Sequence, residues 1–126
     1  MTITEVSKMF NISADTLRYY ERIGLIPAVN RTPGGIRNYT EEDCKWIEYA
    51  KCMRNSGVQV EALIEYVELF QKGDSTTAAR KQILIDQRDI LLEKTLEIQK
   101  TLERLNSKIE RYEETLLKAE NNLIIN

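Results

Sequence analysis

Histidine is absent from this 126-residue chain, and cysteine occurs only twice, as Cys44 and Cys52. Without histidine, the commonest general base and the commonest zinc ligand are both missing. The two cysteines are eight positions apart, which on one helix is too far for a disulfide. No glycine-rich phosphate loop is present, and the carboxylates are scattered along the chain. We therefore expect no bound metal, no cofactor and no enzymatic activity.

Neither sign of charge dominates, because 18 basic residues stand against 20 acidic ones. A protein that holds nucleic acid by its overall charge would be strongly basic, so any DNA binding needs a local basic patch. Residues 1–40 supply a weak one, since five basic and three acidic residues give 5 − 3 = +2. The N-terminus has no basic segment before a long apolar run. We therefore expect a cytoplasmic protein with no membrane segment.

Two short helices, predicted over residues 4–10 and 13–23, open the chain. Thr4 is the expected N-cap of the first helix and Ser13 that of the second, while Gly24 suits a left-handed C-cap. Two short helices joined by a tight turn are typical of a helix-turn-helix motif, whose second helix lies in the major groove of DNA.

The second helix carries the densest group of candidate DNA-binding side chains. Arginine and tyrosine reach phosphates and base edges, and the candidates on this helix are Thr16, Arg18, Tyr19, Tyr20 and Arg22. Taken alone, the stretch fits a recognition helix and a plain amphipathic helix, with Tyr20 half in a core, equally well. The capped helix before it and the predicted hairpin after it favour a recognition helix.

Residues 27–39 are expected to form a β-hairpin wing around a Pro-Gly-Gly turn. Side chains alternate along a strand, so Arg37 and Tyr39 would share one face. Such a wing would hold Arg31 and Arg37 over the sugar-phosphate backbone. The alternative is a solvated hairpin with ordinary surface arginines, which the basic residues of the preceding helix disfavour.

Helices predicted over residues 40–56 and 60–72 complete a head of residues 1–73. Thr40 is a good N-cap and is followed by an acidic first turn, which complements the helix dipole. No comparable cap precedes the second of these helices.

Residues 74–126 contain neither proline nor glycine. From Leu84 to Leu123 the apolar residues alternate in steps of four and three positions, with exceptions at Arg88 and Thr95. About five heptads of this kind predict a coiled coil. A helix of this length cannot bury its seam against so small a head, so we expect a homodimer through it. A single solvated helix is the alternative.

The expected fold class is therefore all-α with a small β-hairpin wing: a winged helix-turn-helix head followed by a long coiled-coil helix. Over its whole length, the chain resembles the MerR family of bacterial transcription regulators. The resemblance depends on the runs TLRYYERIGLI and GIRNY, followed by a helix that ends in Ser56-Gly57 and then by the long C-terminal helix.

The resemblance implies two winged heads joined by an antiparallel coiled coil. It implies binding to double-stranded promoter DNA between the two promoter elements, and activation by DNA distortion that brings both elements to RNA polymerase. The residues that would face the groove are Thr16, Arg18 and Tyr19. Those that would hold phosphates are Tyr20, Arg37 and Tyr39.

Cys52 is the candidate sensor residue. It stands between Lys51 and, two positions on, Arg54, and nearby cations favour the reactive thiolate. The alternative is a small buried apolar side chain. The stretch from Lys51 to Gly57 resembles the AdhR/NmlR-like members of the family, which implies a response to reactive aldehydes and thiol stress through one cysteine. The resemblance gives Cys44 no role, and we interpret it as structural.

Two other functions stay open. The same DNA-binding regulator could respond to a non-covalent small molecule, and a covalent adduct on Cys52 would separate these cases. A coiled-coil interaction protein without an effector is the second alternative, and it would not shift a promoter fragment in an electrophoretic assay.

Overall fold

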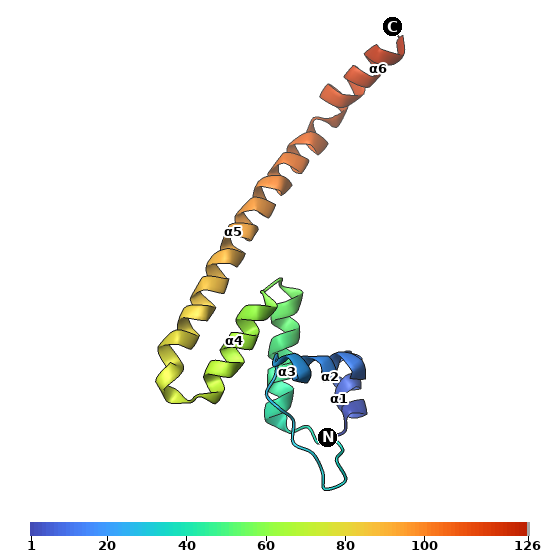
Figure 1. The fold of residues 1–126 in the computed structure, drawn as a ribbon. Coiled ribbons are helices and arrows are strands. Elements are labelled where there is room, and N and C mark those ends of the chain that lie inside the picture. The colour runs from blue at the N-terminus through green and yellow to red at the C-terminus, as the bar shows by residue number, and fades with distance from the viewer. Residues whose placement is uncertain (126) are drawn as a thin grey trace. The chain divides into compact units, whose positions relative to one another are not determined.

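The computed structural model describes residues 1–125, apart from the side chains at 113, 115, 116, 122, 124 and 125. Asn126, the end of the expected coiled coil, and the Leu116 side chain of its seam therefore lie outside the described part. The chain forms two compact units, Met1–Arg88 and Asp89–Asn126. Its helices, drawn in Figure 1, are α1 (Ile3–Phe10), α2 (Ala14–Ile23), α3 (Glu41–Asn55), α4 (Val60–Gln71), the 3-10 turn η1 (Asp74–Thr76), α5 (Thr77–Glu110), the π-helical turn η2 (Tyr112–Leu117) and α6 (Lys118–Ile125).

Local caps fix the ends of the first two helices. Thr2, rather than the expected Thr4, caps α1 and accepts a hydrogen bond from the Glu5 amide. Ser13 caps α2 by accepting from the amide of Thr16 at 3.1 Å. Gly24 ends α2 with a φ of 82°, in the left-handed region that glycine adopts without steric cost. The second of the two predicted N-caps and the predicted C-cap are thus confirmed.

The caps of α3 and α4 also follow the sequence. Thr40 and Asp43 form a reciprocal capping box at the start of α3, in which each side chain satisfies the other residue's amide. Gln59 precedes α4 and makes no side-chain capping bond. Helix α4 is therefore held by its packing, with Leu63 and Val67 buried on one face.

The core of the first unit is formed by residues from α1 to α4 and from the segment after α2. Its largest fully buried side chains are Val6, Leu17, Ile26 and Ile47. Val6, Leu17 and Ile47 lie on the apolar faces of α1, α2 and α3. Ile26 lies in the segment after α2 and anchors it to the core.

The expected wing is present as a turn, but it contains no strand in the described residues. Arg31 and Arg37 form an isolated antiparallel bridge, and the Thr32 amide donates to the Ile36 carbonyl at 2.7 Å. The Asn38 amide donates to the Asn30 carbonyl, also at 2.7 Å. The segments on either side of the Pro-Gly-Gly turn pair only around Arg31 and Arg37 in the described residues. This pairing is too short to form regular strands.

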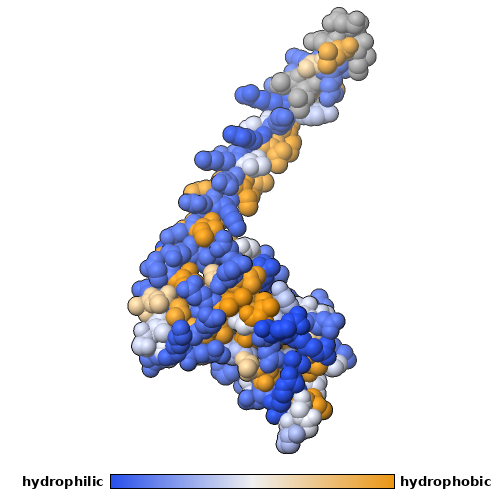
Figure 2. Space-filling view, viewed as in Figure 1, coloured by the Kyte–Doolittle hydropathy of each residue, from blue (hydrophilic) through white to orange (hydrophobic). Residues whose placement is uncertain are grey.

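The C-terminal region was expected to be one continuous helix over residues 74–126, and the structure divides it. The 3-10 turn η1 precedes α5, and the π-helical turn η2 separates α5 from α6. Along the second unit, apolar residues gather on one side of the helix and hydrophilic residues on the other (Figure 2). Several of these apolar side chains are more than half exposed, among them Leu92, Leu96, Ile98, Leu102 and Ile109. No helix in the described residues is long and apolar enough to span a membrane.

Candidate DNA-binding surface and the surroundings of Cys52

Helix α2 presents one exposed polar face. Arg18 forms an ion pair with Asp15 at 2.8 Å, and the Arg22 guanidinium lies 5.4 Å from the centre of the Tyr19 ring. These four residues are three or four positions apart, so they share one side of the helix. Leu17 lies on the opposite side and is fully buried. Burial of Leu17 therefore turns two arginines and a tyrosine toward solvent together.

Thr16 and Tyr20 are less accessible, and both are half-buried. The Thr16 amide and hydroxyl are both bonded to the Ser13 hydroxyl at the start of α2. The carbonyl of Tyr20 accepts from the amide of Leu25 at 2.9 Å. Thr16 therefore stabilises the N-terminal end of α2, and Tyr20 stabilises its C-terminal end.

Both arginines of the expected wing already have partners. Arg31 is exposed and donates from Nη1 to the Gly35 carbonyl at 2.9 Å. Arg37 is half-buried and donates from Nε to Oε1 of Glu21 at 2.7 Å. Arg31 thus stiffens the turn, and Arg37 connects it to α2.

Glu21 is a site residue that the sequence did not predict. Its second oxygen, Oε2, accepts from the Val29 amide at 3.0 Å, so one carboxylate holds both Val29 and Arg37 against α2. Burial by itself would raise the pKa of Glu21. The hydrogen bonds from Arg37 and Val29, and the charges of Arg37 and Arg31, outweigh that effect and lower the pKa below its ordinary value of 4.5. No local signal identifies this contact, because Arg37 is 16 positions away.

Tyr39 requires a correction. The sequence placed it on the DNA-facing side of the wing, but its side chain is only 2% exposed. Its amide donates to the Met1 carbonyl, and its carbonyl accepts from the N-terminal ammonium of Met1. Its buried hydroxyl has no hydrogen-bond partner in the described part of the chain. In this conformation Tyr39 is a core residue and does not present its side chain to a phosphate.

The two cysteines have different surroundings, and the structure contains no disulfide between them. Cys44 is buried; burial, and then the charges of Asp43 and Glu41, raise the pKa of its thiol. Cys52 is exposed on the last turns of α3. It is therefore the cysteine that a reagent in solution can reach.

The two cations near Cys52 in sequence are bonded elsewhere. Lys51 donates from Nζ to the carbonyl of Phe10, at the C-terminal end of α1. Arg54 donates from Nη1 to the carbonyl of Val58 at 3.4 Å. Adjacent positions on a helix point in different directions, so sequence proximity did not predict these partners.

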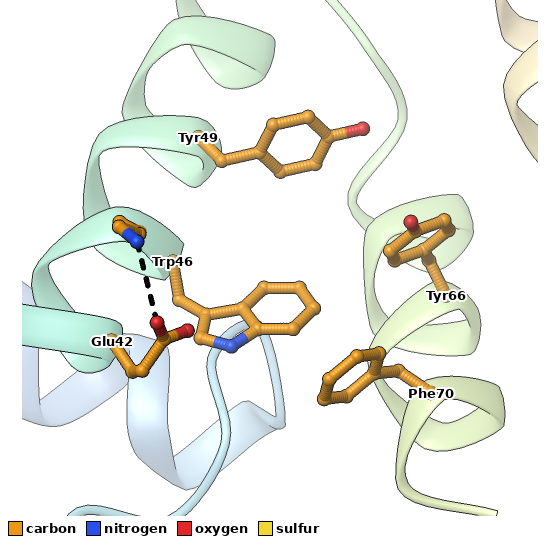
Figure 3. A pocket seen from close by; sticks show the side chains of 6 residues that line it. Glu42, Trp46, Tyr49, Tyr66 and Phe70 are labelled. Atoms are coloured by element: carbon orange, nitrogen blue, oxygen red, sulfur yellow. Dashed lines mark hydrogen bonds and ion pairs between the residues drawn. The ribbon is translucent and has the colours of Figure 1, made fainter. Parts of the chain in front are cut away.

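A hollow lies between α3 and α4, and we call it the aromatic groove (Figure 3). It has a volume of ≈ 260 Å³ and is lined by Glu42, Lys45, Trp46, Tyr49, Tyr66 and Phe70. The rings of Trp46 and Tyr49 extend from α3 toward those of Tyr66 and Phe70 on α4. No single stretch of sequence signals this site, because its two halves lie on separate helices.

No group of three or more potential metal ligands occurs in the part of the chain that the structure describes.

Comparison with known proteins gives a consistent result. The sequence profile of the MerR HTH family regulatory proteins matches residues 1–69. The HTH-type transcriptional regulator AdhR of Bacillus subtilis (strain 168) is 60% identical over 93 residues, which cover 74% of this chain and 66% of that protein. The chain thus spans slightly less than two thirds of that relative's length.

Solved structures agree with the sequence match. HiNmlR, a MerR family regulator that lacks the sensor domain and was crystallised with promoter DNA, is 28% identical with a TM-score of 0.79; the match covers 92% of each chain. A MerR family transcriptional regulator from Bacillus thuringiensis is 29% identical with a TM-score of 0.74, and the match covers 88% of this chain and 97% of that one.

Proposed function

Because this chain belongs to the MerR family of DNA-binding transcriptional regulators, we propose that it binds a promoter as a homodimer and controls transcription by distorting the DNA between the promoter elements. RNA polymerase is then an indirect partner, since the change that reaches it is a change in DNA shape. The observation that carries the proposal is the exposed face of α2, where Arg18, Tyr19 and Arg22 lie together.

Helix α2 is the proposed recognition helix. Arg18 is bonded to the fully solvated Asp15 side chain, and an exposed ion pair of this kind contributes little to stability. Its guanidinium can therefore exchange Asp15 for DNA at low cost. Arg22 and Tyr19 extend the same face by one turn, and Thr16 precedes them at the N-terminal end of the helix, the end that lies nearest the bases in this motif.

The turn of residues 27–39 is the proposed wing. Arg31 is exposed. Arg37 is bonded to Glu21 through Nε, and its two terminal guanidinium nitrogens are the atoms that we propose donate to a phosphate. We assign Tyr20, Arg31 and Arg37 to phosphate contacts, which position a protein on DNA without specifying the sequence. Tyr39 is removed from this group because it is buried.

The long C-terminal helix is the proposed dimerisation element. Apolar side chains along the second unit remain exposed in the single chain. Exposed apolar stripes at heptad spacing are stabilised by pairing with a second helix. A homodimer would hold two recognition helices at a fixed separation, as a two-fold operator requires.

DNA binding can be tested with promoter fragments that the full chain selects from genomic DNA. Arg22→Ala should weaken binding of such a fragment about tenfold or more by fluorescence anisotropy, because it removes a charged contact. Lys45→Ala, which removes an exposed cation on α3, is the matched control and should bind like wild type. Equal binding by wild type and Arg22→Ala would contradict the assignment of α2.

We further propose that Cys52 is the sensor and that a reactive aldehyde or another electrophile modifies it. Its exposure on α3 supports this role, because covalent capture needs access to the sulfur. An adduct enlarges the side chain at this position, and so favours one of two arrangements of the dimer and of the promoter bound to it.

The sensing role is tested by promoter activity in cells under aldehyde challenge. Wild type should respond, and Cys52→Ser should not. Cys44→Ala should respond normally, since that cysteine is buried. Intact-mass analysis should find the adduct on wild type and not on Cys52→Ser. A normal response by Cys52→Ser would reject the sensing role and leave the DNA-binding function in place.

A further inference from the structure

We propose that the aromatic groove binds planar α,β-unsaturated aldehydes that carry an aromatic ring, and that it presents them to Cys52. The proposal assumes the electrophile-sensing function proposed above and adds to it the class of electrophile. It depends on three features of the first unit: the aromatic walls of the groove, the charge of its rim and the position of Cys52 one helical turn beyond Tyr49, which lines the groove.

The walls of the groove are suited to a flat ring. Trp46 lies edge to face with Phe70 and Tyr66, at centroid distances of 5.0 and 6.2 Å, and Tyr49 lies 6.2 Å from Tyr66. Aromatic rings favour edge-to-face or offset contacts with another ring. The volume of ≈ 260 Å³ lies just below the range of about 300–1,000 Å³ that is usual for ligand pockets. The groove therefore favours a compound with a single ring.

The rim of the groove favours a neutral ligand. Glu42 and Lys45 are its two charged residues, and their side chains pair at 3.3 Å (Figure 3). Their charges cancel locally, so neither an anion nor a cation is selected. The Arg80 guanidinium already lies 5.4 Å from the centre of the Phe70 ring. A cationic ligand would be attracted to the same ring, so Arg80 disfavours its binding there.

Cys52 is adjacent along α3 to a residue that lines the aromatic groove. It is three positions beyond Tyr49 on α3, and residues at this spacing are neighbours on a helix surface. Burial raises the pKa of the Tyr49 phenol, and the nearby Tyr66 and Cys52 raise it further. The exposed Cys52 thiol thus neighbours Tyr49, one of the two tyrosines that line the groove. A ring that rests on the aromatic walls would extend its conjugated chain toward this thiol.

The reaction is a conjugate addition and needs no oxidant. The Cys52 thiol gives its proton to solvent, and its sulfur attacks the β-carbon of the enal. The C–S bond forms as the C=C π bond breaks, and the electron pair moves to the α-carbon and its carbonyl. The α-carbon then takes a proton from solvent, so the product is the thioether aldehyde with no leaving group.

The test uses the full chain and two enals with the same reactive group. Cinnamaldehyde carries a phenyl ring on its β-carbon, and crotonaldehyde carries a methyl group there. Alkylation of Cys52 is followed by intact-mass spectrometry. We expect the cinnamaldehyde-to-crotonaldehyde rate ratio to exceed that of N-acetylcysteine by about tenfold, the size of one favourable aromatic contact. The cinnamaldehyde rate should also saturate with concentration, because binding precedes reaction.

Variants of Tyr66 separate the groove from the thiol. Tyr66→Leu should return the ratio to that of the free thiol, whereas Tyr66→Phe keeps the ring and should preserve the wild-type ratio. Cys52→Ser protein provides a second measurement. Trp46 is the only tryptophan, so the unreactive analogue cinnamyl alcohol should quench the intrinsic fluorescence saturably, and Tyr66→Leu should weaken that quenching.

The outcomes distinguish the two proposals. If Cys52 controls the promoter response but its rate ratio matches the free thiol and no saturable quenching occurs, the groove proposal is overturned and the sensor stands. A second copy of the chain seated in the groove would give that same result. If cinnamyl alcohol binds and cinnamaldehyde is accelerated while Cys52→Ser keeps the promoter response, the groove proposal stands and the sensing role fails.

Discussion

Arg37 donates from Nε to Oε1 of Glu21 at 2.7 Å, with both side chains largely shielded from solvent. This ion pair joins the turn of residues 27–39 to α2, and the Val29 amide binds the other oxygen of the same carboxylate. Glu21, which lies within the run that suggested DNA recognition, therefore has a structural role, because it holds the turn against α2. It fixes the orientation of the arginine that we assign to a phosphate.

Glu21→Gln should destabilise the first unit at pH 7 by about 1–3 kcal/mol, because it removes a hydrogen-bonded charge from a partly buried pair. The folded pKa of Glu21 lies below 4.5, so its contribution is complete above that pH and is lost as the pH falls through the folded value. The difference between wild type and variant in urea unfolding should therefore shrink below about pH 4.5. Glu42→Gln, at an exposed pair, should change little at any pH, and a similar loss there would contradict the assignment.

Tyr39→Phe should leave the free energy of unfolding unchanged or raise it by about 1–2 kcal/mol, since it deletes a buried hydroxyl that has no hydrogen-bond partner in the described residues. Urea unfolding measures the effect. DNA affinity should also be unchanged, because the side chain is buried. A tenfold loss of affinity with no change in stability would instead mean that the hydroxyl reaches DNA after a rearrangement.

Leu102→Glu should convert the homodimer to monomer at micromolar concentration, because it places a charge on the apolar stripe of α5 where the side chain is 53% exposed in the single chain. Sedimentation equilibrium measures the association. Glu103→Gln, at the next position, is the control and should remain dimeric. A dimeric Leu102→Glu protein would place the interface elsewhere.

Lys51→Met should lower the stability of the first unit by about 1–2 kcal/mol, because the ammonium no longer caps the Phe10 carbonyl at the end of α1. The rate at which iodoacetamide alkylates Cys52 should stay within about twofold, as the ammonium is already engaged by that carbonyl. A much slower rate in Lys51→Met would restore the activating role that the sequence had suggested for this lysine.

The sequence by itself determined the helices of the first unit. Ser13, Thr40 and Gly24 mark helix ends through bonds or dihedral angles that involve residues only three or four positions away. Such signals act within one turn, so they can be found without knowing the fold. The same local logic put Arg18, Tyr19 and Arg22 on one helix with the other candidate DNA-binding side chains, and the runs TLRYYERIGLI and GIRNY carried the MerR resemblance.

Only the tertiary structure decided the rest. It buried Tyr39, joined Glu21 to Arg37 across 16 positions, and took Lys51 to a carbonyl 41 positions away. It also assembled the aromatic groove from two helices. These contacts depend on how elements distant in sequence pack against one another, and no periodicity or spacing within a single element specifies that packing.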